Sequence, residues 1–317
     1  MFRILQIDGG GIKGILPAII CEELERITRA PICKTFDLIS GTSTGAILGG
    51  LLAFKKSAES IRKLYAHDGP RLFTPRGQWN PRNWVRPKYD RAPFESMLND
   101  LLGDSYLFEA NCEIMATAFG LCANRTHFVK SWNRKDQMLL ARKVIAWSAL
   151  SAARYFGKIS APCYKWSYEM PNGLAGDRVG EVFQDGGQGN HNCTLAYCLT
   201  EVFARGLDKE GPVTILSLGT GDHDTMKTYD DAADTRYFEE IIRFPFQART
   251  ESSINQIMAA RYISANRKNV KVIRINVSLS TDSDKLDAVR HINEFMEMGL
   301  KIVDSEWFRR SLVPLFV

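Results

Sequence analysis

Apolar residues follow two different periods along the chain, and the two kinds of segment alternate from one end to the other. Short runs rich in branched and aromatic residues predict strands at residues 2–7, 36–40, 113–119, 182–184, 213–218 and 271–277. Apolar residues spaced three and four positions apart predict helices at residues 15–29, 46–54, 58–67, 94–102, 138–153, 194–205 and 246–266, and over most of 287–308.

This alternation predicts an α/β fold with a mainly parallel central sheet and helices on both faces. The chain shows no internal repeat, low-complexity segment or convincing linker. We therefore expect residues 1–317 to form one domain.

A serine lies between two glycines where the predicted strand 36–40 meets the apolar helix 46–54. The sequence there is Gly41-Thr42-Ser43-Thr44-Gly45. Gly-x-Ser-x-Gly between a strand and a helix is the pattern of a nucleophile elbow, which exposes the serine hydroxyl. Glycine permits so sharp a turn and tolerates positive φ, and the start of a helix favours an anion nearby. Ser43 is therefore the candidate nucleophile.

A glycine-rich loop follows the first predicted strand, with the sequence Asp8-Gly9-Gly10-Gly11-Ile12-Lys13-Gly14. The spacing also fits a dinucleotide-binding fingerprint, but that site needs an acidic residue at the end of the second strand. Here the acid, Asp37, stands near the start of that strand. The loop therefore favours an oxyanion hole formed by the amides of Gly9, Gly10 and Gly11. A nucleotide-binding Rossmann-type protein is the alternative of a different class.

Two residues compete for the role of general base to Ser43. Asp185 ends a predicted strand and is followed by two glycines, which let the backbone approach closely. His223 lies between two aspartates, at a place in the chain that suits the histidine of a triad. His291 falls in a helical stretch, which suits a triad poorly. The residues alone leave Asp185 and His223 both open.

The positive charge of the chain is concentrated in one segment. The formal net charge is +5, and residues 68–91 hold six basic and two acidic residues, or +4 of it. Four prolines in 69–92 predict a long loop or lid. The segment is either a surface loop pinned by its aromatics or a cationic face for an anionic membrane or ligand. The candidate contacts are Arg71, Arg82, Trp84, Arg86, Lys88 and Arg91.

Other patterns limit the class of protein. Seven cysteines without a Cys-x-x-Cys pair indicate neither a zinc site nor a disulfide framework, and predict buried, reduced thiols. The longest apolar run, 46–54, is far shorter than the ~20 residues of a membrane-spanning helix. Arg3 and Asp8 interrupt any leader-like stretch at the start. We expect a soluble cytoplasmic protein that binds neither DNA nor RNA and needs no metal or organic cofactor.

Three motifs together resemble the patatin-like phospholipases, whose pattern is Asp-Gly-Gly-Gly-x-Arg/Lys-Gly, then Gly-x-Ser-x-Gly, then a distant Asp-Gly-Gly/Ala. Residues 8–14, 41–45 and 185–187 match in order, with Ser43 and Asp185 142 positions apart. The likeness runs from Met1 to about Val277, and 151–153 and 217–221 also look like family signatures. Lys13, Arg154 and residues 190–193 depart from the usual pattern. The resemblance implies a Ser43–Asp185 dyad in place of a triad, with Gly9, Gly10 and Gly11 as oxyanion hole.

Within that family the chain most resembles the CapV-type bacterial phospholipases, effectors of anti-phage (CBASS) defence. The likeness rests on the first glycine loop, on residues 215–221 and on Ile273-Arg274-Ile275-Asn276. It implies a phospholipase that works peripherally at the inner face of the cell membrane. It also implies activation by a cyclic dinucleotide such as cyclic GMP-AMP, and the protein could form a homodimer. The alternative is a constitutive lipid acyl hydrolase without nucleotide control.

Overall fold

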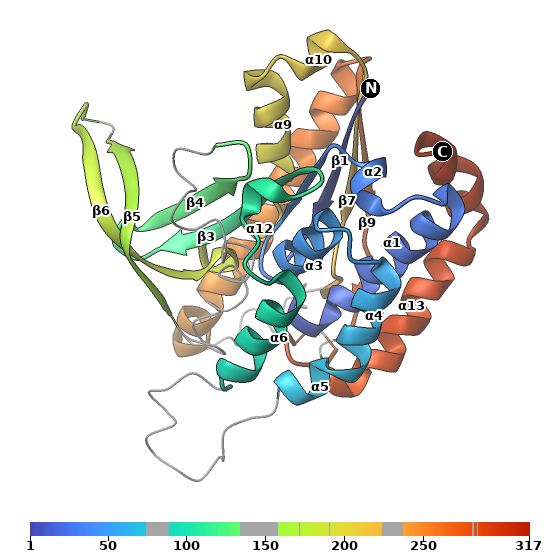
Figure 1. Ribbon diagram of the computed structural model, residues 1–317, viewed down its shortest axis with the longest axis horizontal. Helices are drawn as coiled ribbons and strands as arrows, with labels where there is room; N and C mark the ends of the chain where they lie inside the picture. Colours follow the sequence, from blue (N-terminus) through green and yellow to red (C-terminus); the bar gives the residue numbers. More distant parts are fainter. Residues whose placement is uncertain are drawn as a thin grey trace.

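The computed structural model is an α/β fold in which helices cover both faces of one large sheet (Figure 1). It describes residues 1–73, 89–133, 158–170, 172–189, 191–223, 237–280, 282–283 and 285–317, with the backbone alone for 163, 189, 223 and 237–249. The predicted fold class is confirmed. The predicted domain, residues 1–317, stays a prediction.

Five strands form the parallel part of the sheet, in the order β3-β2-β1-β7-β9. They are β1 (Phe2–Ile7), β2 (Leu38–Gly41), β3 (Glu113–Gly120), β7 (Val213–Leu218) and β9 (Val270–Ile275). Every residue of β2 and β7 is buried, as expected for parallel strands covered on both faces. The carboxyl ends of these strands meet at one edge, where ligands bind in open α/β sheets.

An antiparallel extension continues the sheet beyond β3. It consists of β4 (Arg125–Lys130), β5 (Ile159–Glu169) and β6 (Ala175–Asp185). β4 and β6 pair with β3, and β5 pairs with β6. The predicted strand 182–184 is the end of β6, whereas the sequence pattern predicted neither β4 nor β5. β5 has an irregular register between Ala161 and Lys165, beside Pro162, whose nitrogen cannot donate to a ladder.

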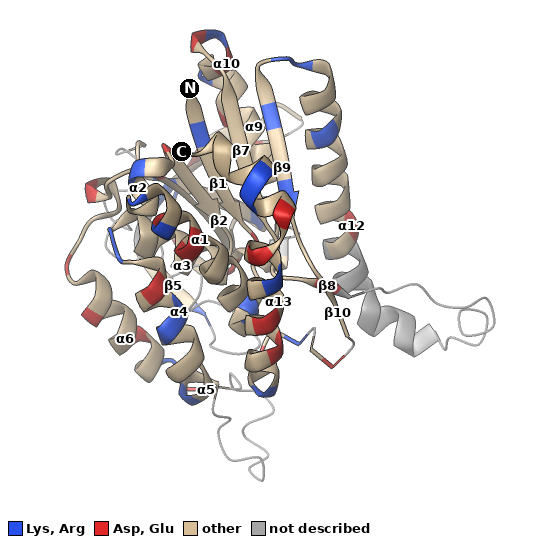
Figure 2. Cartoon of the chain, turned by 90° about the vertical axis from the view of Figure 1, so that its right-hand side faces the viewer, with Lys and Arg blue, Asp and Glu red and all other residues tan. Residues whose placement is uncertain are grey.

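Alternate residues of the central strand β1 face two separate cores. Leu5 and Ile7 pack in one core and Ile4 in the other. The helices of the first layer are α1 (Ile15–Thr28), α3 (Thr44–Ala53), α4 (Ala58–His67) and α13 (Ile292–Asp304), and those of the second are α9 (Leu195–Ala204) and α12 (Tyr237–Asn266). Figure 2 shows α12 and α13 on opposite sides of β9.

Shorter elements complete the described chain. They are the α-helical segments α2 (Ile32–Thr35), α5 (Gly69–Leu72), α6 (Ala92–Leu102) and α10 (Leu207–Glu210), the 3-10 turns η1 (Gly11–Gly14), η3 (Leu107–Glu109), η4 (Gly186–Gly189), η5 (Val289–His291) and η7 (Val313–Leu315), the π-helical η6 (Phe308–Leu312), and the paired strands β8 (Asp222–His223) and β10 (Ser278–Leu279).

Three expectations from the sequence need correction. Residues 69–72 form α5, so the segment 69–92 is not irregular from its start. The helix predicted from residue 246 begins at Tyr237 and continues through Pro245. The thiol of Cys122 is exposed, against the expectation of buried cysteines. The predicted helix 138–153 lies outside the described residues.

No described helix combines the length and the apolar character that crossing a membrane requires. Likewise, no three His, Cys, Asp or Glu side chains in the described part of the chain are grouped so that they could hold a metal ion.

Candidate active site

Ser43 occupies the turn between β2 and α3 in a strained backbone conformation. Its φ is 53° and its ψ is −120°, values that residues with a Cβ rarely adopt. Such strain costs on the order of 1–3 kcal/mol and persists only where the surroundings hold it in place. The Gly45 amide donates to the Thr42 carbonyl (2.8 Å) and closes the turn. The predicted strand–turn–helix context of Ser43 is therefore present.

The glycines on either side of Ser43 are required by close packing. A Cβ on Gly41 would lie 2.4 Å from the carbonyl carbon of Gly45, and a Cβ on Gly45 would lie 2.2 Å from the carbonyl oxygen of Ile7. The positive φ of this turn belongs to Ser43 itself and to neither glycine. The spacing Gly-x-Ser-x-Gly thus lets the elbow press against the end of β1.

The glycine loop lies directly against this elbow. A Cβ on Gly9 would come 3.2 Å from the Cβ of Ser43. The Gly9 amide donates to the Asn192 carbonyl (3.3 Å), whereas within the described residues the amides of Gly10 and Gly11 have no recorded acceptor. Gly11, with a φ of 61°, lines a pocket together with Ser43.

Asp185 reaches the same place through the register of the sheet. β4 occupies one edge of β3, so β2 and β6 share the other edge: Gly41 pairs with Ala116 and Asp185 with Ala118. Asp185 therefore lies just beyond the end of the strand that leads to Ser43. It is 7% exposed, and its Oδ1 accepts the Gly187 amide (2.8 Å). A Cβ on Gly187 would lie 3.8 Å from Cγ2 of Thr42, so this loop packs on the elbow.

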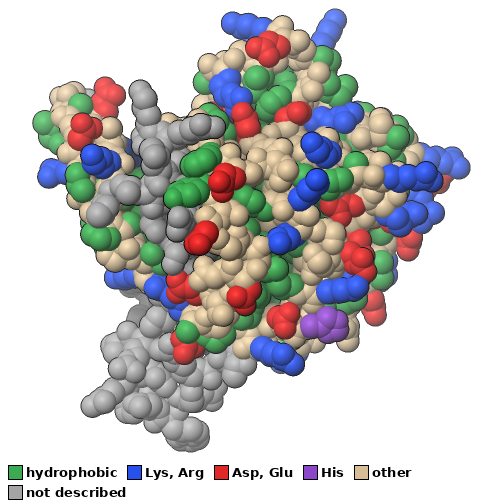
Figure 3. Space-filling model, viewed as in Figure 1, with side chains coloured by type: hydrophobic (Ala, Val, Ile, Leu, Met, Phe, Trp, Pro, Cys, Tyr) green, Lys and Arg blue, Asp and Glu red, His purple; other side chains and the backbone are tan. Residues whose placement is uncertain are grey.

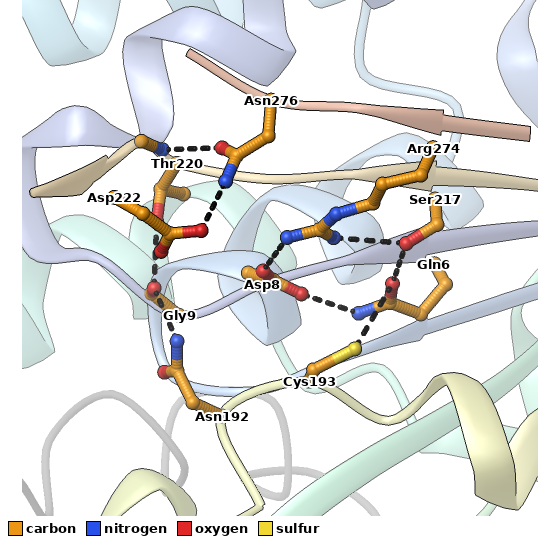
Figure 4. Close-up of polar contacts among 11 residues, drawn as sticks. Gln6, Asp8, Gly9, Asn192, Cys193, Ser217, Thr220, Asp222, Arg274 and Asn276 are labelled. Carbon is orange, nitrogen blue, oxygen red and sulfur yellow. Dashed lines mark hydrogen bonds and ion pairs between the residues drawn. The ribbon is translucent and has the colours of Figure 1, made fainter. Parts of the chain in front are cut away.

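Several polar residues that the sequence did not single out join these three loops. The Thr117 hydroxyl donates to Oγ1 of Thr42 (2.7 Å), and Thr42 donates to the carbonyl of His191 (2.6 Å). The Asn192 amide donates to the Gly9 carbonyl (3.1 Å), as does the Thr220 hydroxyl (2.7 Å) (Figure 4). Thr42 and Thr220 fall within motifs quoted above, but no local pattern indicates these contacts, because each joins segments distant in the sequence.

Three histidine side chains, those of His127, His191 and His291, contact Glu181, Tyr197 and Glu294. His291 precedes α13 and contacts Glu294 through Nδ1 (2.7 Å). Nε2 of His127 lies 3.2 Å from Oε2 of Glu181. The pKa of His127 is lowered, because the effect of burial exceeds the opposing effect of Glu181. The ring of His191 contacts the Tyr197 hydroxyl (3.2 Å). His223 lies in β8, and its side chain is outside what the structure describes.

An apolar pocket opens beside Ser43 and Gly11. Its remaining walls come largely from α4, α5 and α6 and the residues next to them, including Leu64, Leu72, Phe73, Phe94 and Met97. Tyr65 of α4 also lines it and bonds to the hydroxyl of Thr44, and burial raises the pKa of Tyr65. The phenol is therefore neutral at physiological pH. The cavity is narrow, about 50 Å³.

The basic segment begins and ends near this pocket. Phe73 and Tyr89 lie near the start and the end of this segment, and their rings form an edge-to-face contact with centroids 5.3 Å apart. Arg71 is exposed, and its Nη1 lies 4.0 Å from Oδ1 of Asp68. The side chain of Arg91 donates to the carbonyl of Lys158. Arg82, Trp84, Arg86 and Lys88 lie outside the described residues. Over the described part of the face in Figure 3, basic and acidic side chains are interspersed.

Comparison with known proteins places this site in a family. The sequence model of the family described as "Patatin-like phospholipase" matches residues 5–192. Patatin-17 of Solanum cardiophyllum is 31% identical over 172 residues, covering 49% of this chain and 43% of that protein. "Probable inactive patatin-3-Kuras 1" of Solanum tuberosum is 33% identical over 172 residues, covering 49% of this chain and 45% of its own length. The chain thus spans less than half the length of these two relatives.

Among solved structures, that of VipD from Legionella pneumophila is similar with a TM-score of 0.37 and 10% identity, covering 94% of this chain and 67% of that one. A similarity this low carries no argument about the site. The family match, in contrast, includes all three motifs that meet at Ser43. The chain belongs to the patatin-like phospholipase family.

Proposed function

We propose that the protein is a serine lipid acyl hydrolase that cleaves the carboxylic esters of membrane phospholipids. The observation that carries the proposal is the strained backbone of Ser43 (φ 53°, ψ −120°) at a turn against which the glycine loop and the Asp185 loop both pack. Membership in the patatin-like phospholipase family supports a lipid ester as the substrate.

The proposed reaction has two halves. Ser43 Oγ attacks the ester carbonyl carbon while the Asp185 carboxylate takes the hydroxyl proton. The ester C–O bond then breaks, and the leaving alcohol oxygen receives that proton. Water deprotonated by Asp185 attacks the acyl-enzyme, a fatty acid leaves, and Ser43 regains its proton. General-base assistance of this kind contributes roughly 10²–10⁴-fold in rate.

The backbone amides of Gly9, Gly10 and Gly11 are proposed to stabilise the tetrahedral oxyanion. Gly10 and Gly11 are the stronger candidates, because the Gly9 amide already donates to Asn192. Gly11 also faces the pocket that Ser43 lines. Removing one such donor typically lowers kcat by about 10²–10³-fold.

The apolar pocket is the proposed site of the acyl chain next to the scissile ester. Its walls suit a hydrocarbon, but its volume of about 50 Å³ is far below the roughly 300–1,000 Å³ of ordinary ligand pockets. A pocket of this size holds only the part of a fatty acyl chain next to the ester, unless its walls move.

We further propose that a cyclic dinucleotide, of the cyclic GMP-AMP kind, activates the enzyme in anti-phage defence. The sequence resemblance to CapV-type effectors supports this. An unrestrained phospholipase would also degrade the membrane of its own cell. Shifting a resting population from 1:99 to 99:1 requires about 5.5 kcal/mol of differential binding.

The basic segment is proposed to dock on anionic phospholipid at the inner face of the cell membrane, with Arg71, Arg82, Trp84, Arg86, Lys88 and Arg91 as contacts. Six basic residues between 68 and 91 supply the charge. Phe73 and Tyr89 keep the two ends of the segment beside the pocket. Binding of nucleotide phosphates by the same arginines is a competing use.

One experiment separates these proposals from their alternatives. The protein and its Ser43→Ala variant are incubated with mixed phospholipids, with and without a panel of cyclic dinucleotides, and the products are analysed by mass spectrometry. Hydrolysis by the wild type alone supports the enzyme, and its dependence on a nucleotide supports activation. Hydrolysis at full rate without nucleotide indicates a constitutive enzyme. No hydrolysis under any condition indicates a catalytically silent lipid-binding protein.

A further inference from the structure

A closed ring of buried polar contacts lies beneath the glycine loop and joins three parallel strands (Figure 4). Gln6 and Asp8 flank the end of β1, Ser217 lies in β7 and Arg274 in β9. Gln6 donates to Oδ1 of Asp8 (2.9 Å), and Arg274 donates to Oδ2 of Asp8 (2.5 Å). Arg274 also donates to Ser217 (2.9 Å), and Ser217 donates to Gln6, which closes the ring.

The ring holds a carboxylate that immediately precedes the three glycines. The side chains of Asp8 and Arg274 are 5% and 8% exposed, although the two residues stand 266 positions apart in the chain. Burial disfavours the charged form of Arg274, but the Asp8 carboxylate overrides it and raises the pKa of the guanidinium. The guanidinium is therefore charged, and without Asp8 it would lose its buried ion-pair partner.

The contacts continue from Asp8 into the loop itself. The backbone amide of Asp8 donates to the carbonyl of Leu218 (2.9 Å). The carbonyl of the following residue, Gly9, accepts from the hydroxyl of Thr220 (2.7 Å). A Cβ on Gly10 would lie 2.2 Å from the Thr220 hydroxyl, so the loop rests on this threonine. Asn276, two residues after Arg274, accepts the backbone amide of Gly221 (2.8 Å) and so holds the segment that carries Thr220. The end of β9 thus sets where the glycine peptides lie.

We propose that Arg274 is a positioning residue for the glycine loop, acting through Asp8 to aim the Gly10 and Gly11 amides at the oxyanion. The inference rests on the proposed function. A guanidinium suits the task because its planar fork reaches Asp8 and Ser217 at once, whereas the ammonium of lysine is a single point charge. Oxyanion contacts act mainly in the transition state, so misplaced amides lower kcat more than they raise KM.

The test compares Arg274→Lys with wild type by hydrolysis of a soluble short-chain ester. A fluorophosphonate, left to react until labelling is complete, counts the active sites whatever the rate of labelling, and urea unfolding measures stability. Arg205→Gln is the matched control, because Arg205 also makes a two-pronged ion pair, with Glu113 (2.7 and 2.8 Å), but near the opposite end of the sheet. A purely structural loss removes titratable sites, while a positioning loss lowers kcat for each titrated site.

We expect Arg274→Lys to lower kcat per titrated site by about 10-fold or more, a fraction of the roughly 10²–10³-fold lost with a whole donor. KM should change less than threefold, and Arg205→Gln should keep wild-type kcat per site. If Arg274→Lys does not fold, Ser217→Ala replaces it. Its expected loss in kcat is about threefold per site, because it removes the hydrogen bonds of Ser217 with Gln6 and Arg274 but leaves the ion pair of Arg274 with Asp8.

If the folded variant, Arg274→Lys or Ser217→Ala, keeps the wild-type kcat per titrated site, the inference is overturned and the proposed function stands. A wild-type protein that hydrolyses no ester and binds no fluorophosphonate, with or without the panel of cyclic dinucleotides, overturns the proposed function first, and this inference with it.

Discussion

Gly45 lies so close to Ile7 that a Cβ on the glycine would come within 2.2 Å of the Ile7 carbonyl oxygen. The elbow behind Ser43 is thereby pressed against the end of β1, where the glycine loop begins. The position of the nucleophile relative to that loop therefore depends on a backbone-to-backbone contact. A side chain at residue 45 cannot be accommodated by rotating a neighbour.

Gly45→Ala should therefore destabilise the protein and displace Ser43. Overpacking of this kind costs roughly 1–3 kcal/mol, which urea unfolding measures. Gly211→Ala is the matched control, because a Cβ there meets only the Met1 nitrogen at 3.7 Å, an ordinary contact. Equal stability of the two variants would contradict the close packing of the elbow.

Asp185→Asn should abolish most turnover with little loss of stability. The amide has the same shape, and its oxygen can still accept the Gly187 N–H that Asp185 Oδ1 accepts (2.8 Å), but it cannot take the serine proton. We expect kcat to fall by about 10²–10⁴-fold, while His223→Ala keeps most of its activity. The opposite pattern in steady-state kinetics would replace the proposed dyad by a triad.

How far the sequence predicts this protein depends on whether a feature is local. Gly41 to Gly45 and Asp185 to Gly187 carry their geometry in adjacent residues, so the elbow and the strand-end carboxylate were predictable. Arg274 and Asn192 stand in stretches that the sequence marks only by resemblance. Their contacts with Asp8 and Gly9 form only once the chain has folded, so no local pattern predicts them.

The same contrast applies to the fold. The strands β1 and β7 are short segments rich in branched apolar residues, which the pattern finds. Strand β5 contains Pro162, and β6 contains Gly180 at a φ of 91°, so neither reads as a regular strand. Pro245 moved the predicted start of a helix to residue 246, although α12 runs through it. The strands β5 and β6 form by pairing with each other and, through β6, with β3, which no local pattern shows.

Stability should fall on acidification because of His127. Burial lowers the pKa of its imidazole in the folded protein, and Glu181 only partly opposes this. The unfolded chain binds the proton below its ordinary pKa of about 6.5, while the folded protein does not until its lower pKa is reached. The contribution of His127 is therefore complete above about pH 6.5 and declines as the pH falls below it.

Urea unfolding between pH 7.5 and 5 checks this prediction. One proton changes the free energy of unfolding by at most about 1.4 kcal/mol per pH unit. The His127→Gln variant should lack the part of the pH dependence that comes from His127. An identical pH dependence in wild type and variant would contradict the role of His127.

Neutralising Arg82, Arg86 and Lys88 together should weaken binding to anionic liposomes at low salt. Each basic side chain near such a surface contributes about 1 kcal/mol, so the triple variant should lose on the order of 10²-fold in partitioning, as measured by vesicle sedimentation. Hydrolysis of a short soluble ester should change little. A large loss on that ester would mean that the segment contributes to the active site instead.

Covalent labelling of Ser43 tests the central claim most directly. A fluorophosphonate probe reacts with a serine only where an activated hydroxyl and an oxyanion site act together. Intact-mass analysis of wild type should show one adduct, peptide mapping should place it on Ser43, and Ser43→Ala should show none. Equal labelling of both proteins, or an adduct on another residue, would contradict the account of this chain as a serine hydrolase built around that turn.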